Sequence, residues 1–340
     1  MASPTRSSSL RAYALSVALL ATALVLVQGA GSAVRAPFSA CLVTAAGGAD
    51  DPALDGLSVA GLHAAERTGV SGSVLRGTSQ ADAIAQLRLC AQEGTGITIG
   101  VGYGMATAVD QVATEFPRRA FAIVNVDVRG LEHRPANVEG LLFKDEEAGY
   151  LAGYVAGLWA KHRHGDAVGS VGALGIPPVE RAVAGFRFGA KRADRGLDTL
   201  NGYSGSFAVP TNCERQARAQ IAKGSVVELE VAGPCGAGVF AAARAKGKAA
   251  IGFGADQSSF GPFVLTSVLE RADRAVEAAV RLARAGQFPG AVNVTFGVQR
   301  GGIDFGAWSP RVPMSIRRAA NAQYALLQAG RIAGIPTTLP

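Results

Sequence analysis

From Phe38 onward, short apolar runs of strand length alternate with segments whose apolar residues recur at helical spacing. Strands of this length alternating with helices indicate a parallel sheet with helices on both faces. In the first series we predict strands at 40–45, 71–75, 96–102 and 120–126, and helices at 57–67, 80–92 and 107–116.

A second series of the same kind begins with a long predicted helix at 144–162. Its first turn carries Asp145, Glu146 and Glu147, whose charges favour the positive end of the helix dipole. Two doubly wound α/β sheets in one chain are therefore the predicted architecture. We predict further strands at 168–174, 206–210, 226–231 and 249–253, and helices at 179–192, 213–223 and 237–245.

Composition narrows the class of protein. The chain has 340 residues, of which 49% are hydrophobic and 17% charged, and this balance excludes a disordered or fibrous protein. A net charge of +7 spread over this length is ordinary for a soluble surface and gives no reason to expect nucleic-acid binding.

The first 33 residues have the order of a secretory signal. Arg6 and Arg11 precede an apolar run at 12–27, and small residues follow at 29–33. No basic cluster follows as a stop-transfer signal would require, so we expect cleavage near Ala33 and an extracytoplasmic protein. Membrane anchoring through an uncleaved segment, or through a lipid on Cys41, is the alternative.

The remaining cysteines are even in number, as expected of disulfides in an oxidising compartment. Cys41 heads a predicted strand and Cys90 ends a predicted helix, so both lie at the amino edge of the first sheet. Cys213 and Cys235 lie at the carboxyl edge of the second. This favours the pairs 41–90 and 213–235, although connectivity stays open at the level of sequence.

Ligands of open parallel sheets bind outside the carboxyl ends of the strands. The loops that follow the predicted strands are therefore the candidate binding site. They are 47–51, 102–105 and 125–127 in the first series, and 175–178, 233–236 and 254–257 in the second.

One of these loops matches a dinucleotide-binding fingerprint. Gly236 and Gly238 open a predicted helix after a strand, and Asp256 follows at the expected distance. An oxidoreductase using this loop is a minor alternative, because the fingerprint normally opens the first unit of its domain. The other interpretation is a helix N-terminus whose backbone receives an acceptor atom of a ligand.

Motifs of hydrolases, zinc proteases and nucleotide-binding P-loops do not occur in the chain. The histidines have no metal-ligand spacing, and adjacent acids such as Glu146 and Glu147 are better suited to helix starts than to sharing a proton. We therefore expect no enzyme activity, no metal and no cofactor.

The segment at 143–153, Phe-Lys-Asp-Glu-Glu-Ala-Gly-Tyr-Leu-Ala-Gly, resembles the basic membrane protein family, also called the purine nucleoside receptor family. These are extracytoplasmic substrate-binding proteins of ABC importers. The resemblance implies a type I periplasmic-binding-protein fold, with two Rossmann-like lobes, three hinge crossovers and a ligand closed between the lobes. It also implies a small-molecule ligand, an importer permease as partner, and a monomer. It continues in order through 47–51, 177, 185–190, 238–240, 264–268 and 301–303.

On this resemblance we divide the chain into a signal peptide and two discontinuous lobes. The signal peptide is 1–33, the N-terminal lobe is 34–143 plus 250–268, the C-terminal lobe is 144–249 plus 269–290, and 291–340 is a C-terminal segment that packs across the lobes.

Several positions that resemble the family's nucleoside contacts are changed. Leu54 and Asp55 stand where nucleoside-binding members have an aromatic residue and Asn, and Ala182 stands where a ring stacks on the base. Gly254 replaces an Asp and Glu270 replaces a Lys. Lost stacking costs roughly 0.5 to 1.5 kcal/mol per ring, and lost charge-assisted bonds roughly 1.5 to 3 kcal/mol each. These changes argue against purine nucleoside binding in the family's usual manner.

The candidate cleft instead has an acidic balance, which favours a cationic or hydroxyl-rich ligand. Its acids would be Asp55, Asp127, Asp256 and Glu270, and Asn125 replaces a further family Asp. Apolar surface would come from Tyr103, Met105 and Phe253. The full set of expected ligand contacts is Asp51, Leu54, Asp55, Tyr103, Met105, Asn125, Asp127, Ala182, Gly236, Gly238, Gly254, Asp256 and Glu270.

The expected function is solute binding outside the cytoplasm, followed by delivery to an importer permease. Hinge closure would couple the two, because ligand contacts on both lobes stabilise the closed state. A ligand-sensing receptor domain, which docks on a membrane sensor instead, is the main alternative. A paralogue that has lost tight binding is another.

Overall fold

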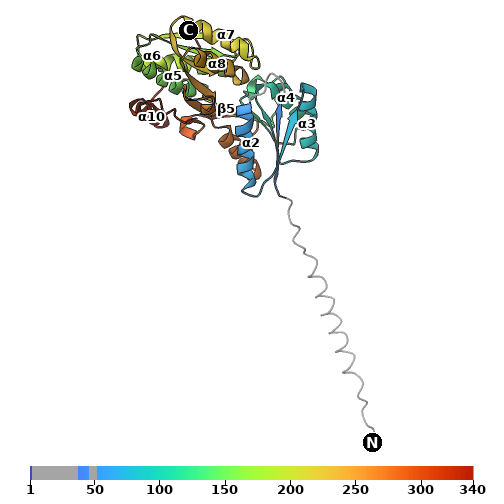
Figure 1. The fold of residues 1–340 in the computed structure, drawn as a ribbon. Helices are drawn as coiled ribbons and strands as arrows, with labels where there is room; N and C mark the ends of the chain where they lie inside the picture. Colours follow the sequence, from blue (N-terminus) through green and yellow to red (C-terminus); the bar gives the residue numbers. More distant parts are fainter. Residues whose placement is uncertain (2–36, 46–51, 340) are drawn as a thin grey trace. The chain divides into compact units, whose positions relative to one another are not determined.

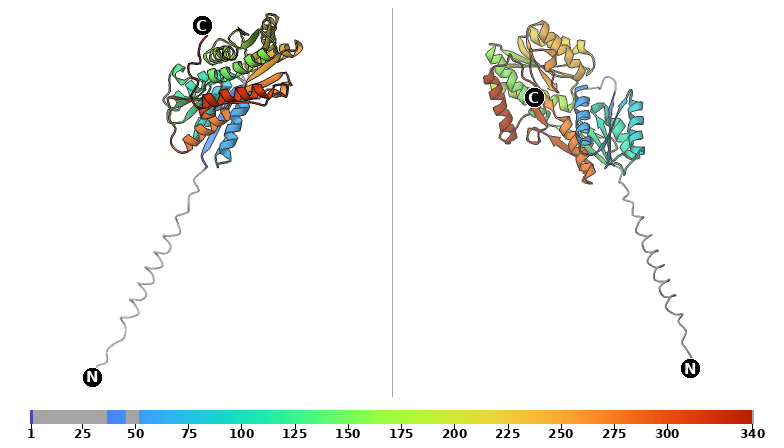
Figure 2. Two further views of the ribbon diagram at one scale, coloured as in Figure 1. Left: turned by 90° about the vertical axis from the view of Figure 1, so that its left-hand side faces the viewer. Right: turned by 60° about the horizontal axis from the view of Figure 1, so that its bottom comes forward.

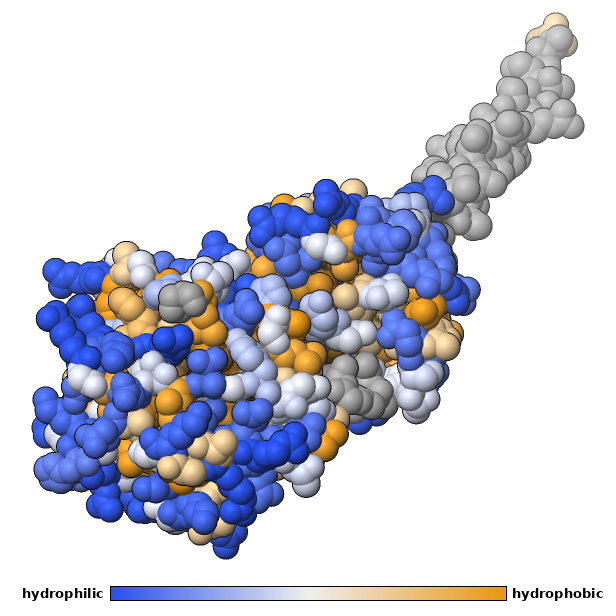
Figure 3. All heavy atoms as spheres, turned by 90° about the horizontal axis from the view of Figure 1, so that it is seen from above, coloured by the Kyte–Doolittle hydropathy of each residue, from blue (hydrophilic) through white to orange (hydrophobic). Residues whose placement is uncertain are grey.

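The structure is a computed structural model that describes Met1 and residues 37–45 and 52–339. The predicted signal segment beyond Met1 and the predicted contact Asp51 lie outside the described residues. By its own contacts, Phe38–Pro340 forms a single unit. None of its described helices is long and apolar enough to cross a membrane. Hydrophilic residues dominate the face in Figure 3, with smaller apolar patches between them.

The first sheet has six parallel strands in the order β11-β5-β4-β3-β1-β2. Alternate side chains of a strand point to opposite faces, so Leu42 packs with the core on one face and Val43 with the core on the other. The strands are β1 Ser39–Ala45, β2 Ser71–Gly77, β3 Ile97–Val101, β4 Phe121–Val124, β5 Val138–Phe143 and β11 Val292–Phe296.

Two pairs of helices cover this sheet (Figure 1). One pair, α2 (Pro52–Glu66) and α9 (Ala272–Arg284), packs together against the face that carries Leu42. The other pair, α3 (Gln80–Gln92) and α4 (Ala106–Glu115), packs against the face that carries Val43. This is the layering that the alternating pattern predicts.

The second sheet repeats this plan in the order β12-β10-β9-β8-β6-β7, with β12 antiparallel to β10. Its covering helices are α5 with α6 and α7 with α8, and α10 packs on α5 (Figure 2). Strands are β6 Ala167–Gly172, β7 Asp198–Tyr203, β8 Ser225–Val231, β9 Ala249–Gly254, β10 Val264–Glu270 and β12 Ile303–Phe305. Helices are α5 Asp145–His162, α6 Pro177–Ala193, α7 Pro210–Ala222, α8 Ala237–Ala245 and α10 Met314–Gln328.

Five single-turn 3-10 helices lie in the loops after the strands of the described chain. They are η1 Tyr103–Met105, η2 Val128–Gly130, η3 Gly233–Gly236, η4 Ser258–Phe260 and η5 Val298–Arg300.

The predicted lobe boundaries need two corrections. The segment 250–268 belongs to the second sheet and not to the N-terminal lobe, because β9 pairs with β8 and β10 pairs with β9. The chain returns to the first lobe only after Glu270, so α9, which lies in the segment assigned to the C-terminal lobe, packs on α2 instead. In the C-terminal segment, β11 joins the first sheet and β12 the second.

The predicted strand at 206–210 is also wrong. The strand of this unit is β7 at 198–203, and Pro210 already begins α7. The sequence Asp-Thr-Leu-Asn-Gly-Tyr lacks a continuous apolar run because β7 is an edge strand whose side chains are half-buried or exposed. An edge strand pairs on one side only, so its sequence carries a weaker signal.

Three crossovers join the two sheets, as the fold class implies. They are the connections from β5 to α5, from β10 to α9 and from β11 to β12. They lie side by side, because the Lys144 amide donates to the Phe296 carbonyl at 3.1 Å and the Arg271 amide donates to the Gly302 carbonyl at 2.8 Å. The three connections therefore form one hydrogen-bonded junction between the sheets.

Both favoured disulfide pairs are confirmed. Cys41 is bonded to Cys90 with a Cα–Cα distance of 6.0 Å, and Cys213 to Cys235 with a distance of 5.7 Å. Each bridge stays within the unit of one sheet, joining β1 to α3 and α7 to η3. A lipid on Cys41 does not fit this arrangement, because its sulfur is buried and bonded to Cys90.

Candidate ligand-binding site

A cavity of about 280 Å³ lies where the carboxyl ends of both sets of strands meet. This is the edge at which open parallel sheets bind their ligands. The first sheet's unit contributes Leu54 from the start of α2, the turn after β3 and the residue after β4. These lining residues are Leu54, Gly102, Tyr103, Gly104 and Asn125.

The second sheet's unit contributes the apolar part of the lining. Its residues come from the loops after β6 and β7, the first turn of α6 and the ends of β8 and β9. They are Leu174, Ile176, Pro178, Val179, Phe207, Val231, Ala232, Gly233, Phe253 and Gly254. A largely apolar wall with few polar groups is typical of small-molecule sites.

The polar part of the lining is a pair of acids at two of the crossovers. Asp145 is the first residue of α5, directly after the β5 crossover, and Glu270 is the last residue of β10, directly before the next. Both are enclosed, with exposures of 0% for Asp145 and 4% for Glu270. Arg181 of α6 donates to Asp145 Oδ2 from Nε at 2.8 Å and makes an ion pair from Nη2 at 2.6 Å.

The two carboxyl groups interact directly. Burial raises the pKa of Asp145, while a hydrogen bond with the Glu270 side chain and the charge of Arg181 oppose that shift. A hydrogen bond between two carboxyl groups needs a proton on one of them. The titrations of the two carboxyl groups are therefore linked.

Asn125 is held in an unusual conformation at the wall of the cavity. Its φ is 63°, in the left-handed region, while its amide donates to the Leu141 carbonyl at 2.8 Å. Its Oδ1 is buried and has no hydrogen-bond partner among the described residues. Backbone strain of this kind concentrates at functional sites, and the free acceptor is available to a ligand.

A buried carboxylate fixes the backbone of the apolar wall from behind. Glu230 of β8 accepts hydrogen bonds from the Ala232 amide at 3.1 Å and from the Phe253 amide at 3.0 Å. Because Ala232 and Phe253 both line the cavity, Glu230 ties the ends of β8 and β9 together at its edge.

Five predicted contacts line the cavity: Leu54, Tyr103, Asn125, Gly254 and Glu270. The structure thus brings together residues from the first turn of one helix, from two loops and from two strand ends. Tyr103 is the most open of them, with 55% exposure.

Two of the predicted acids have other partners and do not line the cavity. Asp55 is buried in α2, and its Oδ2 lies 3.7 Å from Nη2 of Arg76. Asp127 caps η2, pairs with Arg129 at 2.6 Å and accepts a hydrogen bond from Asn293 at 2.6 Å. These bonds, that to Arg129 above all, hold the pKa of Asp127 well below its usual range.

The residues of the dinucleotide fingerprint have structural roles away from the cavity lining. A Cβ on Gly238 would overlap the Pro210 carbonyl, so this glycine allows α8 to pack closely on α7. A Cβ on Gly236 would likewise overlap the carboxyl group of Glu230. Asp256 accepts hydrogen bonds from the backbone amides of Ser258 at 3.0 Å and Ala307 at 3.1 Å.

Met105 and Ala182 are core residues and do not line the cavity. Met105 is fully buried among the residues that pack α3 and α4 on the first sheet. Ala182 faces α5, where a Cβ on Gly149 would overlap the Ala182 carbonyl. The small residues Gly149 and Ala182 therefore allow α5 and α6 to pack closely.

Sequence reasoning missed Asp145, Arg181 and Glu230. Asp145 was interpreted only as a charge at a helix start, because the strand before it, β5, was not predicted. Recognising 138–143 as a strand would have placed Asp145 at a carboxyl edge. No sequence signal distinguishes Arg181 or Glu230 from other charged residues of a helix or strand.

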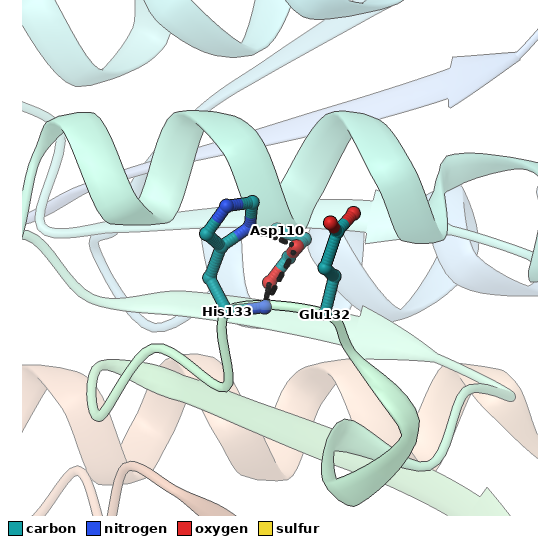
Figure 4. Close-up of side chains that lie close together, drawn as sticks. All are labelled: Asp110, Glu132 and His133. Atoms are coloured by element: carbon teal, nitrogen blue, oxygen red, sulfur yellow. Dashed lines mark hydrogen bonds and ion pairs between the residues drawn. The ribbon is translucent and has the colours of Figure 1, made fainter.

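A further cluster of titratable residues lies away from this cavity. Asp110 of α4 accepts hydrogen bonds from the backbone amide and the ring of His133, the latter at 2.7 Å, and Glu132 lies beside them (Figure 4). The bond to Asp110 raises the pKa of His133. Both oxygens of Asp110 are thus already used in holding the loop onto α4.

A family model described as "ABC transporter substrate-binding protein PnrA-like" (Bmp) matches residues 43–323. The chain belongs to this family. The resemblance to basic membrane proteins is thereby confirmed, and the family is one of substrate-binding proteins and not of enzymes.

Relatives of this family match over most of their length. A CD4+ T-cell-stimulating antigen of Listeria monocytogenes is 28% identical, with 86% of this chain and 89% of that protein covered. The ABC transporter nucleoside-binding protein BmpA of Lactococcus lactis subsp. cremoris is 27% identical, with coverages of 87% and 91%.

Solved structures support the fold class. A solute-binding protein of an ABC transporter system from Aeropyrum pernix K1 superposes with a TM-score of 0.72 at 22% identity, covering 88% of this chain and 94% of that one. The two sheets with their covering helices thus have the type I periplasmic-binding-protein fold.

Proposed function

We propose that this protein binds a small polar molecule in the cavity between the two sheets and delivers it to the permease of an ABC importer. The observation that carries this proposal is the composition of the lining, which comes from both sheets and from two of the three crossovers. A ligand held there contacts every part that would move in a hinge motion.

The proposed mechanism is hinge closure. A ligand stabilises the closed arrangement to the extent that it binds that arrangement more tightly than the open one. The junction also contains a side chain whose contacts would change in such a motion. Glu147 of α5 accepts hydrogen bonds from the Val298 amide at 2.7 Å and from the Lys144 ammonium at 2.8 Å.

The class of ligand follows from the lining and from the family. The Lactococcus relative is named a nucleoside-binding protein, and Tyr103, Phe207 and Phe253 offer rings for a base. The changed positions Gly254 and Glu270 lie in the cavity lining, where they would alter contacts to a nucleoside. The ligand is therefore a nucleoside-like molecule or a different hydroxylated or cationic solute.

The proposed location is outside the cytoplasm. The signal-like segment at 1–33 and the oxidised cysteine pairs support export. Relatives from Pyrococcus species are named lipoproteins, which supports retention at the cell surface. The protein would act there as a monomer that docks on the permease.

A thermal-shift screen of the purified protein tests the binding role. A ligand at 100 times its dissociation constant adds about 2.7 kcal/mol, a clear rise in Tm. The panel contains nucleosides, nucleobases, sugars, polyamines and amino acids. Loss of cellular uptake of the same solute, on deletion of the gene, tests delivery to an importer.

Two phenylalanine variants localise the binding. Phe207→Ala removes a ring from the cavity lining and should weaken a ligand found in the screen several-fold, whereas Phe260→Ala removes a ring of 42% exposure outside it and should not. Equal effects of the two variants, or no shift with any compound, would contradict the proposal.

A further inference from the structure

We propose that a basic, apolar groove on the second sheet's unit is a docking surface for an acidic segment of another protein. The groove lies between α8 and residues 255–263, which connect β9 to β10. Its occupant places an aromatic or large aliphatic side chain in the groove and carboxylates on the cations beside it. This inference goes beyond the proposed function, because the groove shares no lining residue with the solute cavity.

The groove exists because the connection from β9 to β10 is short. Parallel neighbouring strands are usually joined by a crossover helix, which covers the sheet. Residues 255–263 carry only the single turn η4, although β9 and β10 are parallel. The sheet beside α8 is covered instead by a small core that includes Phe240, Ala250 and Phe263. This thinner cover leaves hollows of about 580 and 370 Å³.

Phe260 is the exposed ring of the groove. The centre of its ring lies 4.5 Å from that of Phe240, and the Phe263 ring meets Phe240 edge-on at 6.4 Å. Phe240 and Phe263 are buried, whereas Phe260 is 42% exposed. The two hollows share Arg244, Phe260 and Phe263, so they form one continuous groove.

The shape of this surface favours a protein segment over a membrane. A hollow beside an exposed ring accepts an apolar side chain that projects from a partner, as in the core of a protein interface. Membrane binding requires the opposite shape, an apolar face that projects into the lipid.

Cations surround the groove, and no aspartate or glutamate is among its described lining residues. Arg244 lines both hollows, and Lys248 and Arg311 line the smaller one. Within the part of the chain that the structure describes, none of these three side chains forms an ion pair or a hydrogen bond. All three charges are therefore available to carboxylates of a partner, and the groove is complementary to an acidic segment.

The longer undescribed segments of this chain do not match that occupant. Residues 2–36 contain no aspartate or glutamate. Asp50 and Asp51 fall in the sequence between β1 and α2, which belong to the first sheet's unit. The acidic segment therefore comes from another protein.

Three short peptides test the docking surface. We would titrate the purified protein at pH 7.5 with acetyl-Asp-Glu-Phe-Glu-Asp-amide, with the same peptide carrying serine in place of phenylalanine, and with acetyl-Lys-Lys-Phe-Lys-Lys-amide, using isothermal titration calorimetry. The acidic phenylalanine peptide should bind at least about fivefold more tightly than the serine peptide, and more weakly as salt is added. The basic peptide should not bind. No binding of the acidic phenylalanine peptide at about 1 mM, or equal binding of the basic one, would overturn the inference.

Two lysines of one turn provide a matched pair of charge variants. Lys248→Gln removes a cation from the groove and should weaken the acidic phenylalanine peptide about threefold. Lys246→Gln removes an exposed cation that lines neither hollow and should leave the affinity nearly unchanged. Arg244→Gln should add to the loss in Lys248→Gln. If Lys246→Gln weakened the peptide as much as Lys248→Gln, the groove would not be its site.

The ring has a matched control on the other unit. Phe260→Ala should weaken the acidic phenylalanine peptide about fivefold. Leu89→Ala removes an apolar side chain of 43% exposure on α3 and should have no effect. An unchanged affinity in Phe260→Ala would contradict the proposal.

Two further measurements identify the other possible occupants. Co-sedimentation with phosphatidylglycerol vesicles that is lost in Phe260→Ala, without peptide binding, would make the groove a membrane contact and overturn the inference. A dimer in analytical ultracentrifugation that is lost in Phe260→Ala, again without peptide binding, would make it an interface between two copies of this chain and overturn it equally.

Discussion

The described chain buries carboxyl groups in two different surroundings. Asp145 lies at the wall of a cavity beside the guanidinium of Arg181 and the carboxyl of Glu270. Glu228 lies within β8 of the second sheet and packs against Gly169. A Cβ on Gly169 would collide with the carboxyl oxygens of Glu228. Both acids have an exposure of 0%, so burial alone does not distinguish them.

The difference lies in what opposes burial. Desolvation raises the pKa of Glu228 to about 8, with only the Ser225 hydroxyl acting against it, so this residue is mainly protonated at pH 7. Burial also raises the pKa of Asp145, but there the hydrogen bond with the Glu270 side chain and the guanidinium of Arg181 act against that shift. A buried acid without a cation becomes a neutral packing group, whereas one with a guanidinium and a cavity can serve as a charged binding group.

The largest predicted effect comes from removing Arg181, the cation beside Asp145. Arg181→Met leaves the buried carboxyl group of Asp145 without its guanidinium partner and should lower the free energy of unfolding by about 3 to 5 kcal/mol at pH 7.5. The loss should shrink at lower pH, because protonation of Asp145 removes the uncompensated charge. Urea denaturation measures both effects.

The matched control for that variant lies on the same helix. Arg187→Met removes a guanidinium whose Nε contacts the Thr199 hydroxyl at 3.3 Å, and the described chain holds no carboxylate paired with it. A loss as large as that of Arg181→Met would show that the ion pair is not what stabilises this region.

Replacing the neutral acid, Glu228, should change the free energy of unfolding in the opposite direction. The carboxyl of Glu228 loses its proton above pH 4.5 when unfolded and only near pH 8 when folded, so wild-type stability falls between those values. Glu228→Gln removes that dependence. It should gain nothing below pH 4.5 and about 3 kcal/mol at pH 7. Urea denaturation across this pH range tests it, and a destabilised variant at pH 7 would contradict a protonated Glu228.

The smallest predicted effect on stability concerns the ion pair of His133 and Asp110, in which the histidine is exposed. The bond to Asp110 raises the pKa of His133, so this pair stabilises the fold fully below pH 6.5 and its contribution fades as the pH rises through the folded value. His133→Ala should lower Tm slightly at pH 6 and hardly at pH 9. Glu132→Gln removes a smaller charge that also raises this pKa, so it should lower Tm at pH 6 by less than His133→Ala does. A His133→Ala loss that is independent of pH would argue against the ion pair.

Local sequence patterns predicted most of the elements. The helices at 80–92 and 237–245 match α3 and α8 in both bounds, because their apolar periodicity is continuous and local. The predicted elements stop at 253, so β10, β11, β12, α9 and α10 were not predicted, and β5 and β7 were missed earlier in the chain. A glycine and a glutamate interrupt the apolar run of β5, and β7 is a polar edge strand.

The sequence also predicted the loops of the site better than the directions of their side chains. Parallel strands place their carboxyl ends at one edge, so the loops were identified from order alone, and Tyr103, Asn125 and Gly254 do line the cavity. Asp256 follows β9 in just such a loop, yet its side chain bonds to neighbouring amides. Whether a loop side chain turns toward a ligand or toward its own backbone depends on contacts that sequence order does not specify.

The sequence by itself determined the alternation of strands and helices and the edge that holds the cavity, because these follow from local periodicity and strand direction, and it favoured the cysteine pairs that the structure shows. Only the tertiary structure decided that β9 and β10 belong to the second sheet, and that Asp145 and Glu270 meet across two crossovers. The physical reason is that strand pairing and buried charge pairs join residues far apart in the chain. Their partners are chosen by the packing of the whole unit.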